Sequence, residues 1–250
     1  MLGWDAATFG DTMPDYDGTD WAIAYDEREA TDFLLGFGKD GRALELGVGT
    51  GRVAIPLAES GVPTVGIEGS AAMAAQLTSK LEQENSKVSV DVVVGDFADV
   101  AVPGPFQLVY CVYNTFFLLL SQNEQVKCFR NVADVLAPGG AFVLQTFVPE
   151  PYVMSDRQHT RTLHVSMDKT VLMSAVHYPA RQRVDCQQVV MTKAGNELHP
   201  LAYRYVWPSE MDLMATVAGL SFHQRWGGWM RERFTGEGGC VSVYRKPEAR

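Results

Sequence analysis

A glycine-rich turn after the first apolar segment constrains the fold of this chain more than any other feature. Residues 43–53 read ALELGVGTGRV, which predicts a short buried strand, a turn and the start of a helix. Gly47, Gly49 and Gly51 let the backbone bend tightly and leave bare main chain against which a ligand can lie. The amides at the start of the helix favour an anionic group there. A glycine turn alone is weak evidence, so the interpretation rests on the pattern that follows it.

The segments after this turn alternate between apolar strands and amphipathic helices. We expect strands at 43–46, 64–67, 88–94, 106–112 and 141–146, and helices at 21–37, 51–59, 70–84 and 123–136, with Ser70 capping the third helix. A further helix at 208–219 and strands at 221–225 and 240–244 follow later in the chain. Strands that are apolar throughout and separated by helices predict an α/β fold, in which a parallel sheet is covered on both faces.

The periodicity changes to two between residues 161 and 206. Apolar and polar residues alternate at 163–167, 171–175, 184–190 and 201–205, with turn candidates at 168–169 and 194–196. This pattern predicts an antiparallel β-sheet inserted after the fifth strand. The expected layout is an N-terminal lid and helix at 1–40, a core at 41–150, the inserted sheet at 151–207 as acceptor cover or dimer interface, and completion of the core at 208–250.

The composition narrows the class of partner. The chain has 250 residues and a formal net charge of −9, which argues against nucleic acid and against anionic membranes, since both attract basic faces. The longest apolar run, 106–120, is interrupted and shorter than the roughly 20 residues that a membrane span needs. The N-terminus lacks the basic and apolar regions of a signal peptide, so we expect a cytoplasmic protein. The four cysteines are far apart, which favours neither a zinc ribbon nor a disulfide scaffold.

Acidic residues occur where ligands of an open parallel sheet bind, at the carboxyl ends of its strands. Glu68 ends the second strand and can accept hydrogen bonds from both hydroxyls of a ribose; the alternative is a solvated loop acid. Asp96 follows the third strand, where it can accept a hydrogen bond from an adenine amino group while Phe97 packs on the ring. Glu45 lies inside the first strand, where burial is costly unless its carboxylate pairs with loop amides or a cationic amine.

Two features favour S-adenosylmethionine over NAD as the ligand of this edge. Arg52 stands where a dinucleotide-binding turn has its third glycine. Asp96 would have no purpose in binding NAD. An NAD-dependent reductase is therefore the disfavoured alternative.

The motifs in this order resemble those of the class I S-adenosylmethionine-dependent methyltransferases. They are Glu45–Gly51, Glu68, Gly95–Phe97, the end of the fourth strand and Leu136–Gly140, and the resemblance covers roughly residues 20 to 246. More narrowly, the chain is similar to actinobacterial methyltransferases that modify aminosugars and other natural products. The resemblance implies a Rossmann-like, doubly wound, mostly parallel seven-stranded sheet, with an inserted sheet of a kind often used to form a homodimer.

The same resemblance implies how the chain holds S-adenosylmethionine. Glu68 would bind the ribose, Gly47 and Gly49 would pass close to the methionine part, and Asp96 would bind the adenine amino group. Met73 and Phe97 would flank the adenine. Tyr16 and Tyr25 resemble tyrosines that close over the cofactor carboxylate. The cofactor-binding residues expected in this way are Glu45, Gly47, Gly49, Gly51, Glu68, Met73, Asp96, Phe97, Tyr16 and Tyr25.

The acceptor side of the site is less specified. Catechol-type methyltransferases place a magnesium-binding aspartate at the end of the fourth strand, where this chain has Tyr113-Asn114, so we expect no metal. The catalytic candidates are Asn114, Tyr113 and His177, and the pocket candidates are Tyr113, Asn114, Trp207, Trp226 and Trp229; ordinary packing is the alternative for each. We expect methyl transfer to a small-molecule acceptor, at nitrogen, oxygen or carbon. The alternatives are a peptide or protein N-methyltransferase and a non-catalytic dimerising module.

Overall fold

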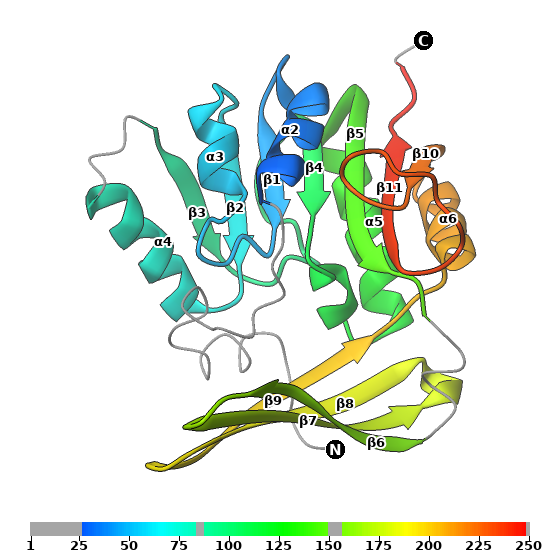
Figure 1. Ribbon diagram of the computed structural model, residues 1–250. Helices are drawn as coiled ribbons and strands as arrows, with labels where there is room; N and C mark the ends of the chain where they lie inside the picture. The colour runs from blue at the N-terminus through cyan, green and yellow to red at the C-terminus, as the bar shows by residue number, and fades with distance from the viewer. Residues whose placement is uncertain (1–26, 84–87, 150–156, 249–250) are drawn as a thin grey trace.

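The computed structural model describes residues 27–83, 88–149 and 157–248, and its centre is a seven-stranded sheet (Figure 1). The strand order is β10-β11-β5-β4-β1-β2-β3. The strands are β1 (Ala43–Leu46), β2 (Thr64–Glu68), β3 (Val90–Val94), β4 (Phe106–Cys111), β5 (Leu136–Phe147), β10 (Ser221–Trp226) and β11 (Gly239–Arg245). Strands β1 to β5 pair in parallel, whereas β11 is antiparallel to both β5 and β10. The expected mostly parallel, Rossmann-like sheet is confirmed.

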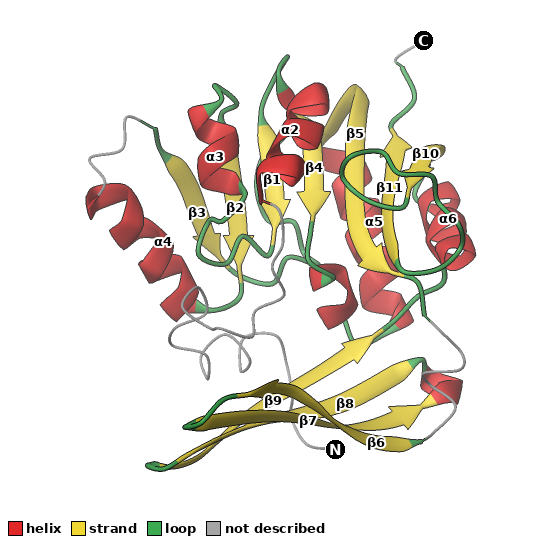
Figure 2. Cartoon of the chain, viewed as in Figure 1, coloured by secondary structure: helices red, strands yellow, loops and turns green. Residues whose placement is uncertain are grey.

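Helices cover both faces of this sheet (Figure 2). They are α2 (Glu27–Gly38), α3 (Ala54–Glu59), α4 (Ala71–Gln83), α5 (Gln122–Val135) and α6 (Pro208–Val217), with short 3-10 helices η1 (Thr115–Leu118) and η2 (Pro179–Arg181). Apolar residues of α2 pack with Leu108 and Val143 on one face of the sheet. Residues of α5 and α6 pack with Val109 and Phe142 on the other. Strands β4 and β5 are therefore buried from both sides, as their continuous apolar sequences require.

The helix starts follow from local sequence. Ser70 caps α4, since its hydroxyl accepts a hydrogen bond from the backbone N–H of Met73 at 3.2 Å, and the predicted cap is confirmed. Helix α3 begins at Ala54 rather than at the expected residue 51. Gly51 has a φ of +85°, a left-handed conformation that cannot belong to a right-handed helix, and the chain needs two more residues to enter the helix.

Strand β5 begins five residues earlier than expected. Leu136 pairs with Phe106 of β4, and the register shifts before Leu108 pairs with Ala141. Helix α5 ends at Val135, shortly before the predicted stop at Pro138-Gly139-Gly140. These three residues lie in the irregular first part of β5. Gly139 also donates a backbone hydrogen bond to the carbonyl of Lys246 at 3.0 Å, which ties this segment to the end of β11.

A separate four-stranded antiparallel sheet lies below the carboxyl ends of the core strands (Figure 1). Its strands are β6 (Gln158–Val165), β7 (Lys169–Tyr178), β8 (Arg183–Thr192) and β9 (Gly195–Arg204), in that order. The predicted insertion is confirmed, but its first strand is displaced. The expected segment 163–167 begins at a register shift between Thr162 and His164, and fully exposed Met167 lies in the following turn. Alternation over five residues could not reveal this bulge, because a bulge changes the face of every later side chain.

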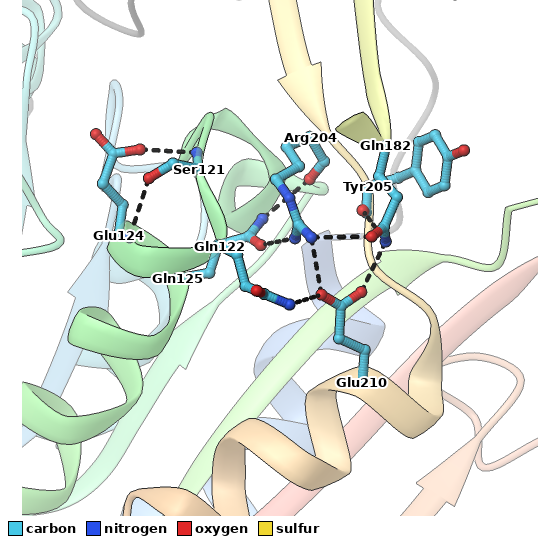
Figure 3. Close-up of polar contacts among 8 residues, drawn as sticks. All are labelled: Ser121, Gln122, Glu124, Gln125, Gln182, Arg204, Tyr205 and Glu210. Carbon is cyan, nitrogen blue, oxygen red and sulfur yellow. Dashed lines mark hydrogen bonds and ion pairs between the residues drawn. The ribbon is translucent and has the colours of Figure 1, made fainter. Parts of the chain in front are cut away.

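A buried polar cluster fastens the inserted sheet to the core (Figure 3). The Arg204 guanidinium, at the end of β9, donates to the side-chain oxygens of Gln125, Gln182 (2.9 Å) and Glu210 (2.8 Å). Burial acts to raise the pKa of Glu210, but hydrogen bonds from Gln182, Arg204 and Gln122 outweigh it and lower that pKa. One arginine thus joins α5, the β7–β8 turn and α6. No helix in the described part of the chain is long and apolar enough to cross a bilayer.

We expect Arg204→Met to lower the free energy of unfolding by about 3 kcal/mol, because it leaves the half-buried Glu210 carboxylate and the buried Gln125 amide without their cationic partner. Urea unfolding followed by circular dichroism would measure the change. Lys127→Met is the control, since Lys127 pairs with Asp99 at the exposed surface and its loss should leave the unfolding midpoint unchanged. Equal effects of the two substitutions would contradict a structural role for the cluster.

Candidate functional site

The glycine turn between β1 and α3 is held by the neighbouring strand and leaves one side open. The backbone N–H groups of Gly47 and Val48 both donate to the carbonyl of Ile67, at 2.9 and 3.0 Å. A Cβ atom on Gly47 would clash with the Thr115 methyl group, so only glycine fits between the ends of β1 and β4. A Cβ on Gly49 would meet no atom within 4 Å. The turn therefore presents bare backbone to open space, as close approach of a ligand requires.

Glu68 occupies the expected position at the end of β2 and is buried. One carboxylate oxygen accepts a hydrogen bond from the N–H of Gly49 at 2.7 Å, and the other accepts one from the N–H of Ser70 at 2.9 Å. A carboxylate has about four lone-pair positions, and it is an acceptor group of the kind that binds the two hydroxyls of a diol. The chemistry of this group fits a ribose beside the glycine turn.

Glu45 lies beneath the same turn and is 2% exposed. The Tyr110 hydroxyl donates to its carboxylate at 3.0 Å. Burial raises the pKa of Glu45 to about 8; the hydrogen bond from Tyr110 opposes this rise, and the nearby Glu68 adds to it. A buried acid with a raised pKa next to the turn suits a cationic amine, whose charge would favour the ionised form. We expected loop amides or a cationic amine as partners of Glu45. The structure adds a tyrosine hydroxyl, that of Tyr110, to the backbone N–H of Ala54.

The end of β3 adjoins the end of β2, which places the predicted adenine residues at the same edge. The N–H of Gly95 donates to the carbonyl of Glu68 at 2.9 Å. Asp96 is exposed and its carboxylate accepts from the N–H of Ala98 at 2.8 Å, which fixes its direction. Met73 and Phe97 are both buried, and Phe97 belongs to the main apolar core. Contact of Met73, Asp96 and Phe97 with an adenine remains a prediction.

The end of β4 has an unusual backbone that the sequence did not reveal. Tyr113 and Asn114 are consecutive residues with left-handed φ values of +56° and +62°. Both backbone N–H groups are fixed by Gln145 of β5: Tyr113 donates to its side-chain oxygen and Asn114 to its carbonyl, the latter at 3.2 Å. The Asn114 side-chain oxygen is buried and has no hydrogen-bond partner among the residues that the structure describes. Left-handed non-glycine residues are strained and cluster at functional sites, so this turn is a candidate for the acceptor side.

The turn lies at the topological switch point of the sheet. Strand order reverses between β1 and β4, and ligands of doubly wound sheets bind in the crevice there. The Gly47–Thr115 contact shows that the turns after these two strands are neighbours. Asn114 is therefore brought to the glycine turn by the fold, although the two are distant in sequence.

The remaining predicted residues lie on β7, before α6, and at and after the end of β10. His177 is buried on β7, with its Nε2 atom 2.9 Å from the Tyr205 hydroxyl. Trp229 packs on Phe33 of α2 with ring centroids 5.4 Å apart, and Trp226 contacts the same cluster. Trp207 is 37% exposed before α6. The contacts of the tryptophans are those of ordinary packing, and their roles as pocket walls remain untested. Tyr16 and Tyr25 lie outside the described residues.

Metal ligands were not expected, and no group of three or more His, Cys, Asp or Glu side chains is placed to hold a metal within the described ranges. The independence from metals stays a prediction. All four cysteines are buried with free thiols.

Comparison with known proteins identifies the class of this site. A methyltransferase-domain family model matches residues 43–140. The chain is 36% identical in sequence to the CcbJ methyltransferase from Streptomyces caelestis. The alignment covers 98% of this chain and 100% of CcbJ, and the two structures superpose with a TM-score of 0.92. It is 29% identical to a cypemycin N-terminal methyltransferase from Streptomyces sp., over 78% of this chain and 79% of that protein. CalS10, an amino pentose methyltransferase from Micromonospora echinaspora, shares the fold at 21% identity, with a TM-score of 0.64 over 90% and 92% of the chains.

We expect Glu45→Gln to change how stability depends on pH. Glu45 has a folded pKa of about 8, above its ordinary 4.5, so its contribution to stability is complete below pH 4.5 and is lost as the pH rises toward 8. Glutamine keeps the bond with Tyr110 and has no such loss. Relative to the variant, the unaltered protein should lose on the order of a few kcal/mol of unfolding free energy across this window. Glu59→Gln, at an exposed position, is the control and should leave the pH dependence of the unfolding free energy unchanged. If the unaltered protein and Glu45→Gln showed the same pH dependence, burial of Glu45 would not be the cause of its raised pKa.

We expect Glu68→Ala to weaken binding of S-adenosylhomocysteine by more than about tenfold, because it removes the acceptors for both ribose hydroxyls. Isothermal titration calorimetry measures the dissociation constant directly. Glu59→Ala, at the exposed end of α3, is the matched control and should bind as the unaltered protein does. An unchanged constant for Glu68→Ala would place the ribose elsewhere.

Proposed function

Because this chain belongs to the class I S-adenosylmethionine-dependent methyltransferases, we propose that it methylates an amine nitrogen of a small-molecule acceptor, a natural-product intermediate. Bound S-adenosylmethionine supplies the methyl group from a sulfonium centre, for direct transfer to a nucleophile. The protein then has to position two molecules and keep water out, and alignment of this kind can contribute roughly 7–11 kcal/mol. The fold supplies separate elements for the two tasks.

The cofactor would lie along the ends of β1, β2 and β3. Glu68 would bind the ribose, and the open backbone at Gly49 would lie against the methionine part. Glu45 would face the amino group of the methionine part from beneath the turn. Asp96 would accept from the adenine amino group. These assignments agree in chemistry with the donors and acceptors that the site offers.

The observation that carries the proposal is the unpartnered side-chain oxygen of Asn114. A buried carbonyl oxygen without a donor costs free energy that a bound N–H would recover. Its position at the switch point, beside the glycine turn, is where an acceptor must lie to meet the methyl group. Asn114 would accept a hydrogen bond from the amine and orient its lone pair; the neutral amine needs no base before transfer.

The inserted sheet supports a compact acceptor. Tyr203 of β9 packs on Phe147 at the end of β5, with ring centroids 5.9 Å apart, and Phe147 packs on Phe117 of η1 at 4.9 Å. The inserted sheet thus contacts the segment that follows Asn114 and covers this part of the carboxyl edge. A covered edge suits a metabolite better than an extended chain.

A peptide N-terminus is the second candidate, because the similar cypemycin enzyme carries that activity in its name. The net charge of −9 would attract an ammonium group of either kind. The two candidates differ in the size of the molecule that carries the amine.

Methyl transfer to a panel of aminosugars, small amines and short peptides, followed by release of S-adenosylhomocysteine, tests the proposal. Asn114→Gly should lower kcat/KM for the accepted amine by about tenfold to a hundredfold, because it removes the orienting acceptor while glycine tolerates the left-handed backbone. Binding of S-adenosylhomocysteine should not change. Arg231→Gly replaces another left-handed residue, away from this turn, and should retain full turnover. Preference for peptides over every small amine would select the second candidate.

A further inference from the structure

The inward-facing side of the inserted sheet has a cationic character that the acidic chain as a whole lacks. This side is defined by Ala175, Val184 and Cys186, which pack in the core. The β-sheet pairing places the following residues on the same side: His159, Arg161, His164, Lys169, His177, Gln188, Glu197, His199 and Tyr203. Four of the five histidines of the chain therefore share one face with an arginine and a lysine. Glu197 is the acid among these paired positions, and it lies beside His199.

Arg161 is an exposed residue of this face. It is paired with Met173 on β7, and Met173 is paired in turn with Gln188 on β8. The register therefore places Arg161 on the same side of the sheet as Cys186 and Tyr203, and its positive charge acts to lower the pKa of both groups against the larger opposite effect of burial. No acid forms an ion pair with Arg161 among the residues that the structure describes.

Two further side-chain atoms on this face lack hydrogen-bond partners within the part of the chain that the structure describes. The Nδ1 atom of His159, two residues before Arg161 on β6, is buried and unbonded. So is the Oε1 atom of Gln188, which lies in the same row of the sheet as Arg161, beyond Met173. Buried polar atoms of this kind are rare in folded proteins and call for an explanation. The face that carries Arg161 thus also carries two polar atoms whose hydrogen-bonding capacity is unused.

We propose that the methyl acceptor carries an anionic group, a carboxylate or a phosphate, which Arg161 binds on the inward-facing side of the inserted sheet. Arginine binds both groups through two parallel N–H bonds, and its planar fork sets their orientation. His159 and Gln188 contact the atoms beside the anion. The contact of Tyr203 with Phe147 connects this face to the carboxyl edge where Asn114 holds the amine. The inference rests on the proposed function and adds the chemistry of the distal end of the acceptor.

Saturation-transfer NMR on the full chain, saturated with S-adenosylhomocysteine, tests this inference with matched probes. L-phenylalanine and L-phenylalaninamide differ in a carboxylate, and phosphoethanolamine and ethanolamine differ in a phosphate. The anionic member of at least one pair should bind more tightly than its neutral partner, and the two pairs distinguish the two anions. Arg161→Gln should weaken that anionic probe by about tenfold, with the neutral probe unchanged. Arg161→Lys should recover part of the affinity, because it keeps the charge and loses the fork.

Arg181→Gln is the matched control, since Arg181 is exposed in the turn after β7. It should bind every probe as the unaltered protein does. Equal binding within both pairs, binding of none of the probes, or an anionic preference that survives in Arg161→Gln would each overturn the inference. Calorimetry with S-adenosylhomocysteine distinguishes failure of the proposed function from failure of anion binding by Arg161. Failure of that ligand to bind would overturn the proposed function, whereas its binding without an anionic preference overturns the inference alone.

Discussion

Two hydrogen bonds to the Glu68 carboxylate hold together the edge of the sheet where the cofactor would bind. Glu68 ends β2 and binds the N–H of Gly49 with one oxygen and the N–H of Ser70 with the other. The glycine turn and the start of α4 are thereby fixed to one point at the edge of the sheet. Ionised carboxylates accept stronger hydrogen bonds than neutral groups do, and Glu68 is buried enough for these bonds to be little screened. A residue read from the sequence as a ligand for ribose therefore also builds the surface on which the ribose would lie.

Much of the fold could be predicted from the sequence because its signals are local. Buried strand segments such as 108–111 are apolar throughout, and Ser70 stands where a helix needs a cap. The turn at Gly47 to Gly51 needs left-handed residues that only glycine adopts without strain. The inserted sheet was evident from alternation, but its first register was not. The shift at Leu163 depends on pairing with β7, which no window of a few residues records.

The acceptor side was less predictable because its geometry is made by contacts between distant segments. Nothing in the sequence Tyr113-Asn114 signals two consecutive left-handed residues. That conformation depends on Gln145, which fixes both N–H groups from the next strand. Trp229 packs on α2 and Trp207 is partly exposed, and their predicted role as pocket walls remains a prediction. The predicted cofactor residues follow from residue type at strand ends, whereas the geometry at Asn114 depends on tertiary contacts.

The inserted sheet leaves the core after β5 and returns to it through Arg204, immediately before α6. Its strands contribute nothing to the seven-stranded sheet, and the turns that would bind the cofactor come from β1, β2 and β3. Inward-facing positions of β6 to β9 that do not pack in the core, such as Arg161 and Gln188, could therefore be exchanged without disturbing the turns that would bind the methyl donor. Because of this separation, the acceptor selectivity could change through substitutions in the inserted sheet while the cofactor-binding turns stay the same. The same short segment is available to protein engineering.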